Sequence, residues 1–539
     1  MSSYDYVIVG AGSSGSALAG RLATNNNTKI LLLEAGPKDY NPYIKLPIGY
    51  GKLFYDQSVN WKFYTEPEEN LNGKKMYWPR GKVLGGSSSI NAMVYARGLE
   101  TDYENWGSNK EWSFENIKKV YSSMEQQINH DKEFLTKEKI PVNNVSKHHH
   151  PILEYFFNAS NEIGIKKNTN LTTSIENQVG HYNINTYKGT RHSSSKVFLK
   201  PVLKNPRLTL LDNTQVKNLI IKDKKITGIK IQNKSTEQII QLSHGAILCS
   251  GSIMTPYLLM HSGIGDKEHL KKFDKEIIID NSNVGRNLQD HLGLDYLFKT
   301  HHHSLNKSLG TWSGRIISVL RYLYNRKGPL SLSINQSGGY INWNSKHHYP
   351  NLQIYFNPLT YSITHKNKRP LLKTDKFNGF IIGYNSCRPK SLGTVKLNSP
   401  NFGDTPLINP NFLSHEEDIY DVKCAINFSK VLANTNSIKK IRNESVTHDL
   451  LNATEEEMIN HFKSNAVSIY HPCGTCKMDE DPKKGVVTER LKVHGMENLW
   501  IADASVFPNI TSGNINAPVM MLANLGSKFI IEDLKKFNL

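Results

Sequence analysis

Three glycines near the start of the chain have the types and spacing of a nucleotide-binding turn. Gly10, Gly12 and Gly15 form the pattern Gly-x-Gly-x-x-Gly. A buried strand pattern at residues 6–9 precedes them, and a helix pattern at 16–23 follows. Glycines at this spacing permit a tight turn, let the backbone approach a pyrophosphate, and let the helix pack closely on the strand. Because the start of such a helix offers free N–H groups to phosphates, we predict a dinucleotide site.

An acidic residue supports the same interpretation. A second strand pattern at residues 29–33 ends at Glu34, nineteen residues after Gly15. A carboxylate here can accept hydrogen bonds from the ribose hydroxyls, which favours NAD or FAD over NADP. The motif alone does not separate NAD from FAD. A glycine-rich turn without a ligand is the alternative, and the complete strand–turn–helix–strand context argues against it.

Two other groups of residues could do chemistry but are interpreted as structural. Cys473 and Cys476 form a Cys-x-x-Cys pair, and we favour packing over a redox dithiol because the small thioredoxin-like context is missing. Histidine triplets at residues 148–150 and 301–303 are expected in surface loops. Consecutive residues cannot all face one ion, and no partner stands at ligand spacing. No metal site is predicted.

The elements that must position these residues fall into two kinds. The first part of the chain has a parallel strand–helix–strand start, and later parts have mixed strands, which together suggest an α/β part and an α+β part. Residues 125–150 are polar and are expected to form an irregular exposed excursion. Antiparallel strands are expected over residues 352–400, including 394–397. Further short strands are expected at 208–211, 216–221, 226–231 and 245–249, and helices at 415–434 and 455–465.

Composition excludes several classes of protein. The chain has 539 residues, of which 38% are hydrophobic and 21% charged, which excludes collagen, coiled coils and wholesale disorder. No apolar run is long enough to cross a membrane, and five cysteines are too few for a disulfide scaffold. The first six residues carry no basic stretch typical of a secretion signal, so a cytoplasmic location is expected.

The net charge of +18 has two interpretations. Such an excess can mark contact with nucleic acid or with an anionic membrane surface. Lysine greatly outnumbers arginine, asparagine is abundant, and the basic residues are spread along the chain, as AT-rich coding would produce. This argues against nucleic acid as a partner, while peripheral membrane contact stays open.

Longer motifs give the chain a family resemblance. They lie at residues 81–91, 251–265, 283–291 and 471–478, with 503–505 and 512–518 near the end. Together they resemble the glucose–methanol–choline (GMC) oxidoreductases, and most closely the bacterial choline-dehydrogenase-like branch. The resemblance implies an FAD-binding Rossmann-like domain and a substrate domain built on an antiparallel sheet. It divides the chain into an FAD-binding region at 1–296, a substrate-binding domain at 297–465 and a C-terminal return to the FAD domain at 466–539.

The resemblance also implies which residues bind the cofactor. Some relatives bind FAD covalently through a histidine one position before Asn91. This chain has Ile90 there, so the FAD is expected to be non-covalent. Asn516 and Pro518 would open a helix over 519–529 whose start points at the flavin. The predicted FAD-binding residues are Gly10, Gly12, Ser14, Gly15, Glu34, Ala35, Gly85, Gly86, Ser87, Asn91, Ala92, Val94, Val216, Ser250, Gly251, Asp503, Ala504, Asn516 and Pro518.

In the family, the histidine of the motif at 471–478 accepts the hydroxyl proton of an alcohol while a hydride leaves for the flavin. The resemblance therefore makes His471 the base, a role that suits a histidine near its ordinary pKa. Asn514 would orient the substrate oxygen. We expect oxidation of a small primary or secondary alcohol, choline or another, to an aldehyde or ketone. Another histidine, His261, is taken as structural.

Several alternatives stay open from the sequence. An FAD photoenzyme or lyase on the same fold is one, and a non-catalytic scaffold that coats nucleic acid is another; the complete His–Asn pair argues against both. The flavin-type motifs argue against an NAD enzyme. The electron acceptor could be oxygen, a quinone or a soluble carrier, and the oligomeric state is open. A choline pocket would need aromatic or acidic residues, and five aromatics are available: Trp61, Tyr64, Trp312, Tyr355 and Phe356.

Overall fold

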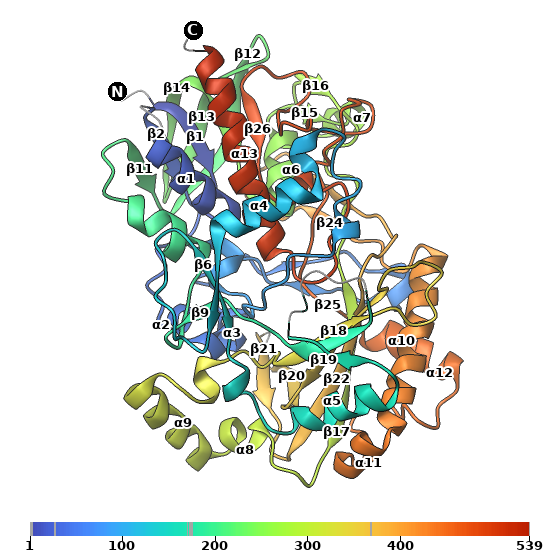
Figure 1. Ribbon diagram of the computed structural model, residues 1–539. Coiled ribbons are helices and arrows are strands. Elements are labelled where there is room, and N and C mark those ends of the chain that lie inside the picture. The colour runs from blue at the N-terminus through green and yellow to red at the C-terminus, as the bar shows by residue number, and fades with distance from the viewer. Residues whose placement is uncertain (1–3, 26–27, 170, 172–175, 367–368, 538–539) are drawn as a thin grey trace.

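The computed structural model describes residues 4–25, 28–169, 171, 176–366 and 369–537, and shows a molecule of two parts (Figure 1). Each part is built around a seven-stranded sheet. The chain passes repeatedly between the two parts, so segments far apart in sequence meet in both. Residues 1–3, on which part of the expectation about a secretion signal rests, lie outside the described residues.

The first sheet contains the predicted strand–helix–strand unit. β1 pairs in parallel with β2, and α1 (Ser13–Asn25) connects them. β14 joins two halves of this sheet: its first half pairs antiparallel with β13, and its second half pairs in parallel with β1 and β26. The strand order is β11 (Leu208–Leu211), β2 (Ile30–Leu33), β1 (Tyr4–Val9), β14 (Thr236–Leu248), β13 (Lys225–Asn233) and β12 (Thr214–Lys222), with β26 (Leu499–Ile501) beside β14.

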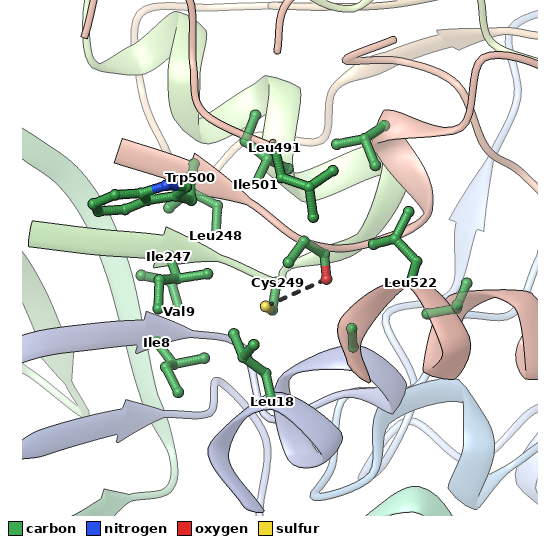
Figure 2. Close-up of a cluster of buried hydrophobic side chains, with 14 of the residues drawn as sticks. Ile8, Val9, Leu18, Ile247, Leu248, Cys249, Leu491, Trp500, Ile501 and Leu522 are labelled. Atoms are coloured by element: carbon green, nitrogen blue, oxygen red, sulfur yellow. Dashed lines mark hydrogen bonds between the residues drawn. The ribbon is translucent and has the colours of Figure 1, made fainter. Parts of the chain in front are cut away.

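The core of this part forms where the chain's beginning, middle and end meet (Figure 2). Ile8 and Leu248 lie on neighbouring parallel strands and are fully buried. Leu18 of α1 and Leu522 of α13 (Asn516–Phe537) cover them. Burying a side chain of this size stabilises the fold by about 1.5–3 kcal/mol. The glycine-rich turn therefore projects from a rigid base.

The second sheet is antiparallel apart from the parallel pair β7–β8, as expected of the substrate part. α5 (Leu153–Glu162) and α10 (Glu416–Asn434) pack on it, with Phe156 stacked on Phe356 at 5.0 Å. The strand order is β25 (Val467–Ser468), β17 (Leu292–Lys299), β22 (Gly379–Ser386), β19 (Leu352–Asn357), β18 (Ser337–Ile341), β8 (Gln178–His181) and β7 (Lys166–Lys167). The predicted domain boundaries stay predictions, with β7 and β8 joining this sheet from within residues 1–296.

One expectation about the elements is wrong. Residues 125–150 contain two strands, β5 (Glu125–Asn129) and β6 (Ile140–Asn144), which pair in parallel. Ile128 and Val142 are buried, and Asn143 exchanges backbone hydrogen bonds with Ile184. The polar residues that suggested an exposed loop alternate with these apolar ones. The hydrogen-bonding partner of β6 comes from a distant segment, at Ile184.

The helices agree better with the sequence. α10 and α12 (Glu455–Asn465) lie where expected, and α13 begins at Asn516 but continues past the expected end at 529. Several helices were not predicted, among them α8 (Leu305–Gly310) and α9 (Trp312–Asn325). Smaller elements include α4 (Phe114–Met124), α6 (Gly251–His261), α7 (Lys267–Lys271), β9 (Thr186–Tyr187), β10 (Thr190–Arg191), β20 (Tyr361–Lys366), β21 (Arg369–Thr374), β23 (Thr394–Lys396) and β24 (Leu407–Asn409). Within the described ranges, no helix combines the length and apolar character needed to cross a bilayer.

Candidate active site

Two glycine-rich segments meet backbone to backbone at the start of α1. Gly10 has a φ of +100°, and a Cβ on Gly15 would lie 1.8 Å from the Gly10 oxygen, so neither position accepts a side chain. The Gly85 N–H donates to the Ala11 oxygen at 2.8 Å. A Cβ on Gly86 would lie 2.7 Å from Gly12 Cα. This contact leaves bare backbone around the first turn of α1, as a bound pyrophosphate requires.

A cavity opens beside this contact and encloses about 570 Å³, part of it open to solvent. Glu34 reaches its wall from the end of β2. Its Oε2 accepts from the Ala11 N–H at 3.0 Å, and its Oε1 accepts from the Gly36 N–H at 2.8 Å. Burial raises the pKa of Glu34 to about 7. Each oxygen keeps a lone pair for a ribose hydroxyl. The predicted residues that line the cavity are Gly10, Gly12, Glu34, Ala35, Gly86, Val216 and Ser250.

Asp503 fixes the backbone on the opposite side. Its Oδ2 accepts from the Gly251 N–H at 2.8 Å and from the Thr255 hydroxyl at 2.7 Å, and its Oδ1 accepts from the Ser505 N–H. The carboxylate thus caps the start of α6 and joins it to Ala504. Burial raises the pKa of Asp503 above its ordinary value. Its oxygens are engaged by the protein, so Asp503 positions the backbone around the cofactor site.

Asn91 is held by a residue that the sequence did not single out. Asn91 Oδ1 accepts from the Met93 N–H at 3.0 Å and from Arg191 Nη1 at 2.8 Å. Arg191 is buried, its Nη2 has no hydrogen-bond partner among the described residues, and burial lowers its pKa to about 9. Ala92 packs in an apolar cluster, and Val94 in a cluster with tyrosines. No sequence signal pointed to Arg191, because its role depends on a contact 100 positions away.

The start of α13 lies against the start of α1. The Ser13 hydroxyl donates to Asn516 Oδ1 at 2.8 Å, and Pro518 stands in the first turn of α13. Ser14 is buried in the first turn of α1. The Ser87 hydroxyl accepts from the Gly81 N–H at 3.2 Å. Two helix starts therefore face one region, and their N–H groups favour a negatively charged group there.

His471 stands at the end of the second sheet that faces this region. β17 and β25 pair through Leu292 and Ser468, and the Ile469 N–H donates to the His291 oxygen at 2.9 Å. His471 follows two residues after Ile469, and its ring meets that of His291. The two Nδ1 atoms lie 2.9 Å apart. His471 Nε2 lies 3.1 Å from Asn514 Nδ2. The predicted catalytic pair is therefore in contact, with His291 behind it.

The hydrogen bonds assign the protons on both rings. A carbonyl oxygen only accepts, so His291 Nε2, 3.0 Å from the Cys387 oxygen, carries a proton. In the neutral ring its Nδ1 then accepts from His471 Nδ1–H. His471 Nε2 is left with a lone pair, which the Asn514 amide faces. Burial, with His291 and Arg80, lowers the pKa of His471 well below its ordinary value, which keeps the ring neutral.

The backbone around His471 is pinned on three sides. Asp290 Oδ1 accepts from the His471 N–H at 2.6 Å, and Arg80 donates to the Tyr470 oxygen at 2.6 Å. The Ser252 hydroxyl donates to the Pro472 oxygen at 2.7 Å, which ties this segment to the start of α6. Burial raises the pKa of Asp290 to about 7. A base held this firmly is pre-positioned for proton transfer.

Asn514 is positioned by a buried carboxylate. Asp102 accepts from the Ser512 N–H at 2.8 Å and the Ser512 hydroxyl at 2.9 Å, and Arg388 Nε lies 2.8 Å from it. Gly513 has a φ of +81°, and a Cβ there would lie 2.3 Å from Tyr340 Oη. Asn514 Oδ1 is buried without a hydrogen-bond partner among the described residues.

Other sequence interpretations can be placed against this geometry. Cys473 and Cys476 are buried free thiols, as packing residues would be. His261 packs between Tyr257 and Phe402. The triplet at 301–303 is exposed, whereas His149 contacts His181 and is partly buried. In the ranges that the structure describes, no cluster of three histidine, cysteine or acidic side chains could hold a metal ion.

Comparison with known proteins agrees with the fold and the motifs. Two models of the GMC oxidoreductase family match residues 4–293 and 389–523. The chain is 34% identical to an alcohol dehydrogenase [acceptor] of Pseudomonas putida, over 98% of this chain and 96% of that protein. It is 30% identical to an oxygen-dependent choline dehydrogenase of Brucella suis, over 98% and 95%. The crystal structure of pyridoxine 4-oxidase from Mesorbium loti superimposes with a TM-score of 0.85 at 26% identity, over 97% and 98%.

The expected fold is confirmed on both counts, a Rossmann-like part and a part on an antiparallel sheet. The family models cover the segments that carry the glycine contact, His471 and Asn514, and the relatives match nearly the whole chain. This protein belongs to the GMC oxidoreductase family.

Proposed function

We propose that this protein oxidises an alcohol to an aldehyde or ketone with non-covalently bound FAD. Relatives of similar length are named as alcohol and choline dehydrogenases. The glycine contact, the cavity lined by Glu34 and the two helix starts fit a dinucleotide. Ile90 is buried where covalent relatives carry a histidine. When bound, FAD supplies the acceptor for the two electrons and the hydrogen that leave the alcohol carbon.

The lone pair on His471 Nε2 is the observation that carries the proposal. The substrate hydroxyl displaces the Asn514 amide from Nε2 and gives its proton to that nitrogen. Asn514 then holds the substrate oxygen by donating an Nδ2–H hydrogen bond to it. Since the His471 ring is neutral at neutral pH, it can take the proton without first losing one.

We further propose that the substrate is an uncharged alcohol with an apolar chain. Ala92 packs against an apolar cluster that contains Met93, Leu305 and Ile334. Of the aromatics considered for choline, Trp312 and Tyr64 are exposed and Phe356 lies in the core, while Tyr355 shares a cluster with Val94. The P. putida relative is also somewhat more similar than the choline dehydrogenases.

The test is an anaerobic titration of the purified flavoprotein with aliphatic alcohols of increasing chain length and with choline. We expect an aliphatic alcohol to bleach the flavin absorbance. Admitting air afterwards separates an oxidase, which recovers its absorbance at once, from a dehydrogenase that needs another acceptor. Bleaching by choline alone would contradict the proposed substrate class.

His471→Ala tests the base. Removing a general base lowers the rate by about 10²–10⁴-fold, measured as flavin reduction in a stopped-flow instrument. His261→Ala is the control, since that histidine is also buried but packs against aromatic rings elsewhere. Both variants should keep their FAD. Near-normal flavin reduction in His471→Ala would overturn the assigned role.

A further inference from the structure

α9 has its polarity reversed relative to an ordinary surface helix. The residues it buries are Ser318 and Tyr322, while its large apolar side chains point to solvent. Tyr324 is 90% exposed, Trp312 78% and Leu323 65%. Single exposed apolar residues are common, but a contiguous apolar patch marks an interaction surface. The exposed apolar residues of α9 are Trp312, Ile316, Ile317, Val319, Leu320, Leu323 and Tyr324.

The helix geometry gathers these residues on one side. At 3.6 residues per turn they occupy an arc of about 160°, with Ser318 and Tyr322 opposite. Arg315 and Arg321 are exposed and flank the arc, one about 40° beyond each edge. An apolar face bordered by basic residues is typical of a helix that lies in the surface plane of a membrane.

The charged residues on α9 and along the sequence around it are of one sign. Arg326 and Lys327 follow the helix and are exposed. No aspartate or glutamate stands between Asp295 and Asp375. Two copies of this face would bring like charges together in a symmetric interface. An anionic lipid surface supplies the opposite charge, so charge complementarity favours a membrane over a second copy.

The ends of the helix carry residues suited to the lipid–water boundary. Trp312 begins α9 and Tyr324 stands one residue before its end, and aromatic rings with a polar edge concentrate at that boundary. The helix has 14 residues, about 21 Å, which is too short to cross a bilayer. It can lie along the surface, with its apolar arc among the acyl chains.

α9 is attached firmly to the rest of the molecule. The Tyr322 hydroxyl donates to the Gly189 oxygen at 2.9 Å, in the turn before Arg191. Leu305 and Leu309 of the neighbouring α8 pack in the same cluster as Ala92. Figure 1 shows α8 and α9 together at a corner of the molecule remote from the first sheet. The apolar surface therefore adjoins a buried cluster that reaches the predicted cofactor site.

We propose that α9 docks this protein on an anionic membrane surface, with its apolar arc inserted and Arg315 and Arg321 at the headgroups. The docking does not depend on the reaction, so its test leaves the proposed function untouched. It would bring the cluster around Ala92 close to apolar molecules dissolved in the bilayer.

The first test is flotation of the FAD-loaded protein with lipid vesicles. Phosphatidylcholine vesicles are compared with vesicles that also contain phosphatidylglycerol, and wild-type protein should float with the second kind. Ile317→Ser/Leu320→Ser/Leu323→Ser should weaken binding by at least about tenfold. These side chains are exposed, so thermal unfolding should show an intact fold. Binding unchanged in this variant would overturn the proposal.

A charge-matched pair separates α9 from the general positive charge. Arg315→Gln/Arg321→Gln should lose most binding to anionic vesicles. Lys222→Gln/Lys224→Gln removes the same amount of charge from the exposed end of β12 and the turn to β13, at the other end of the molecule. This variant should retain its binding to anionic vesicles. Equal losses would mean that total charge, not α9, drives binding, and would overturn the assignment.

Tryptophan fluorescence gives a second measurement. Trp312 should be quenched by vesicles of brominated lipid, and the quenching should largely vanish in Trp312→Phe. Sedimentation without lipid tests the alternative that a second copy of this chain covers the apolar face of α9. If wild-type protein is a dimer and the triple serine variant is a monomer, the face is an interface between copies and the proposal fails.

Discussion

The Nδ1 atoms of His291 and His471 lie close enough to share one hydrogen bond, and the Cys387 carbonyl decides its direction. His291 does not face the Asn514 amide; it acts through His471 and is a positioning residue. Without an acceptor at this place, the buried Nδ1–H of His471 would lack a partner, and the other ring tautomer would compete. Leaving a buried donor unpaired costs about 1–3 kcal/mol.

Two substitutions at His291 should separate proton placement from packing. His291→Asn offers an amide oxygen in place of Nδ1 and should keep most of the limiting rate of flavin reduction. His291→Leu fills similar space without an acceptor and should lower that rate by about 5–150-fold. Substrate affinity should change little in either, which stopped-flow titration measures. Equal losses in both variants would show that only packing matters.

At this scale the sequence motifs singled out His471 and Asn514, which the structure brings into contact, and the glycines that require bare backbone. It did not indicate Arg191 or the role of His291. Motifs report residues near each other in sequence. His291 and His471, in contrast, meet because the chain after β25 continues alongside the start of β17, and Arg191 reaches Asn91 across the fold.

The loop before α13, which carries Asn514, is positioned by residues of other elements. Asp102 holds Ser512, and Asn514 follows two residues later. Between them Gly513 combines a left-handed backbone with a close approach to Tyr340 of β18. Tyr340 of the second sheet thus lies so close to the loop that carries Asn514 that only a glycine fits at position 513.

Gly513→Ala should therefore displace Asn514 and lower the rate of flavin reduction by at least about tenfold. Gly164→Ala is the matched control, because Gly164 also has a φ of +81° but has open space around its Cβ position. Both should lose about 1 kcal/mol of stability from backbone strain, measured by urea unfolding, and only the first should lose activity. Equal activities would show that the Tyr340 contact does not position Asn514.

The elements predicted best are those encoded locally. The β1–α1–β2 unit has its strand, turn and helix signals within one short stretch, and the structure confirms it. β5 and β6 were missed because their burial comes from partners such as Ile184. α9 was not predicted, although its apolar residues recur at helical spacing. That spacing shows that a helix has an apolar side, but it does not show whether this side faces the protein or the solvent.

At the scale of the whole molecule, an ion pair between the buried Asp102 and the partly buried Arg388 joins the two parts. Asp102 belongs to a segment after the second glycine motif, and Arg388 follows β22 of the second sheet. Arg388 also lies over the Tyr349 ring at 3.9 Å. Burial raises the pKa of Asp102, and Arg388 opposes that rise.

Arg388→Met should lower the free energy of unfolding by about 3–5 kcal/mol, because Asp102 is left buried and unpaired. The pKa of Asp102 then rises further above that of the unfolded chain, so the folded state binds the proton more readily. The loss should shrink as the pH is lowered and Asp102 binds its proton, measured by urea unfolding at several pH values.

Lys299→Met is the control, since Lys299 and Glu444 form an exposed pair whose loss should cost at most about 1 kcal/mol. If Arg388→Met cost no more than this control, the two parts would be held together by packing alone.

The hydrogen bond between Ser13 and Asn516 spans 503 positions of the chain. During synthesis the glycine-rich turn leaves the ribosome long before β26 and α13, which cover its base. Contacts of such long sequence separation form slowly. Until then β1 and β14 expose apolar surface, and we expect this surface to bind chaperones. The sheet that carries the glycine-rich turn is thus begun before β26 and α13 are made and completed only after them, so we expect FAD to bind only once α13 is in place.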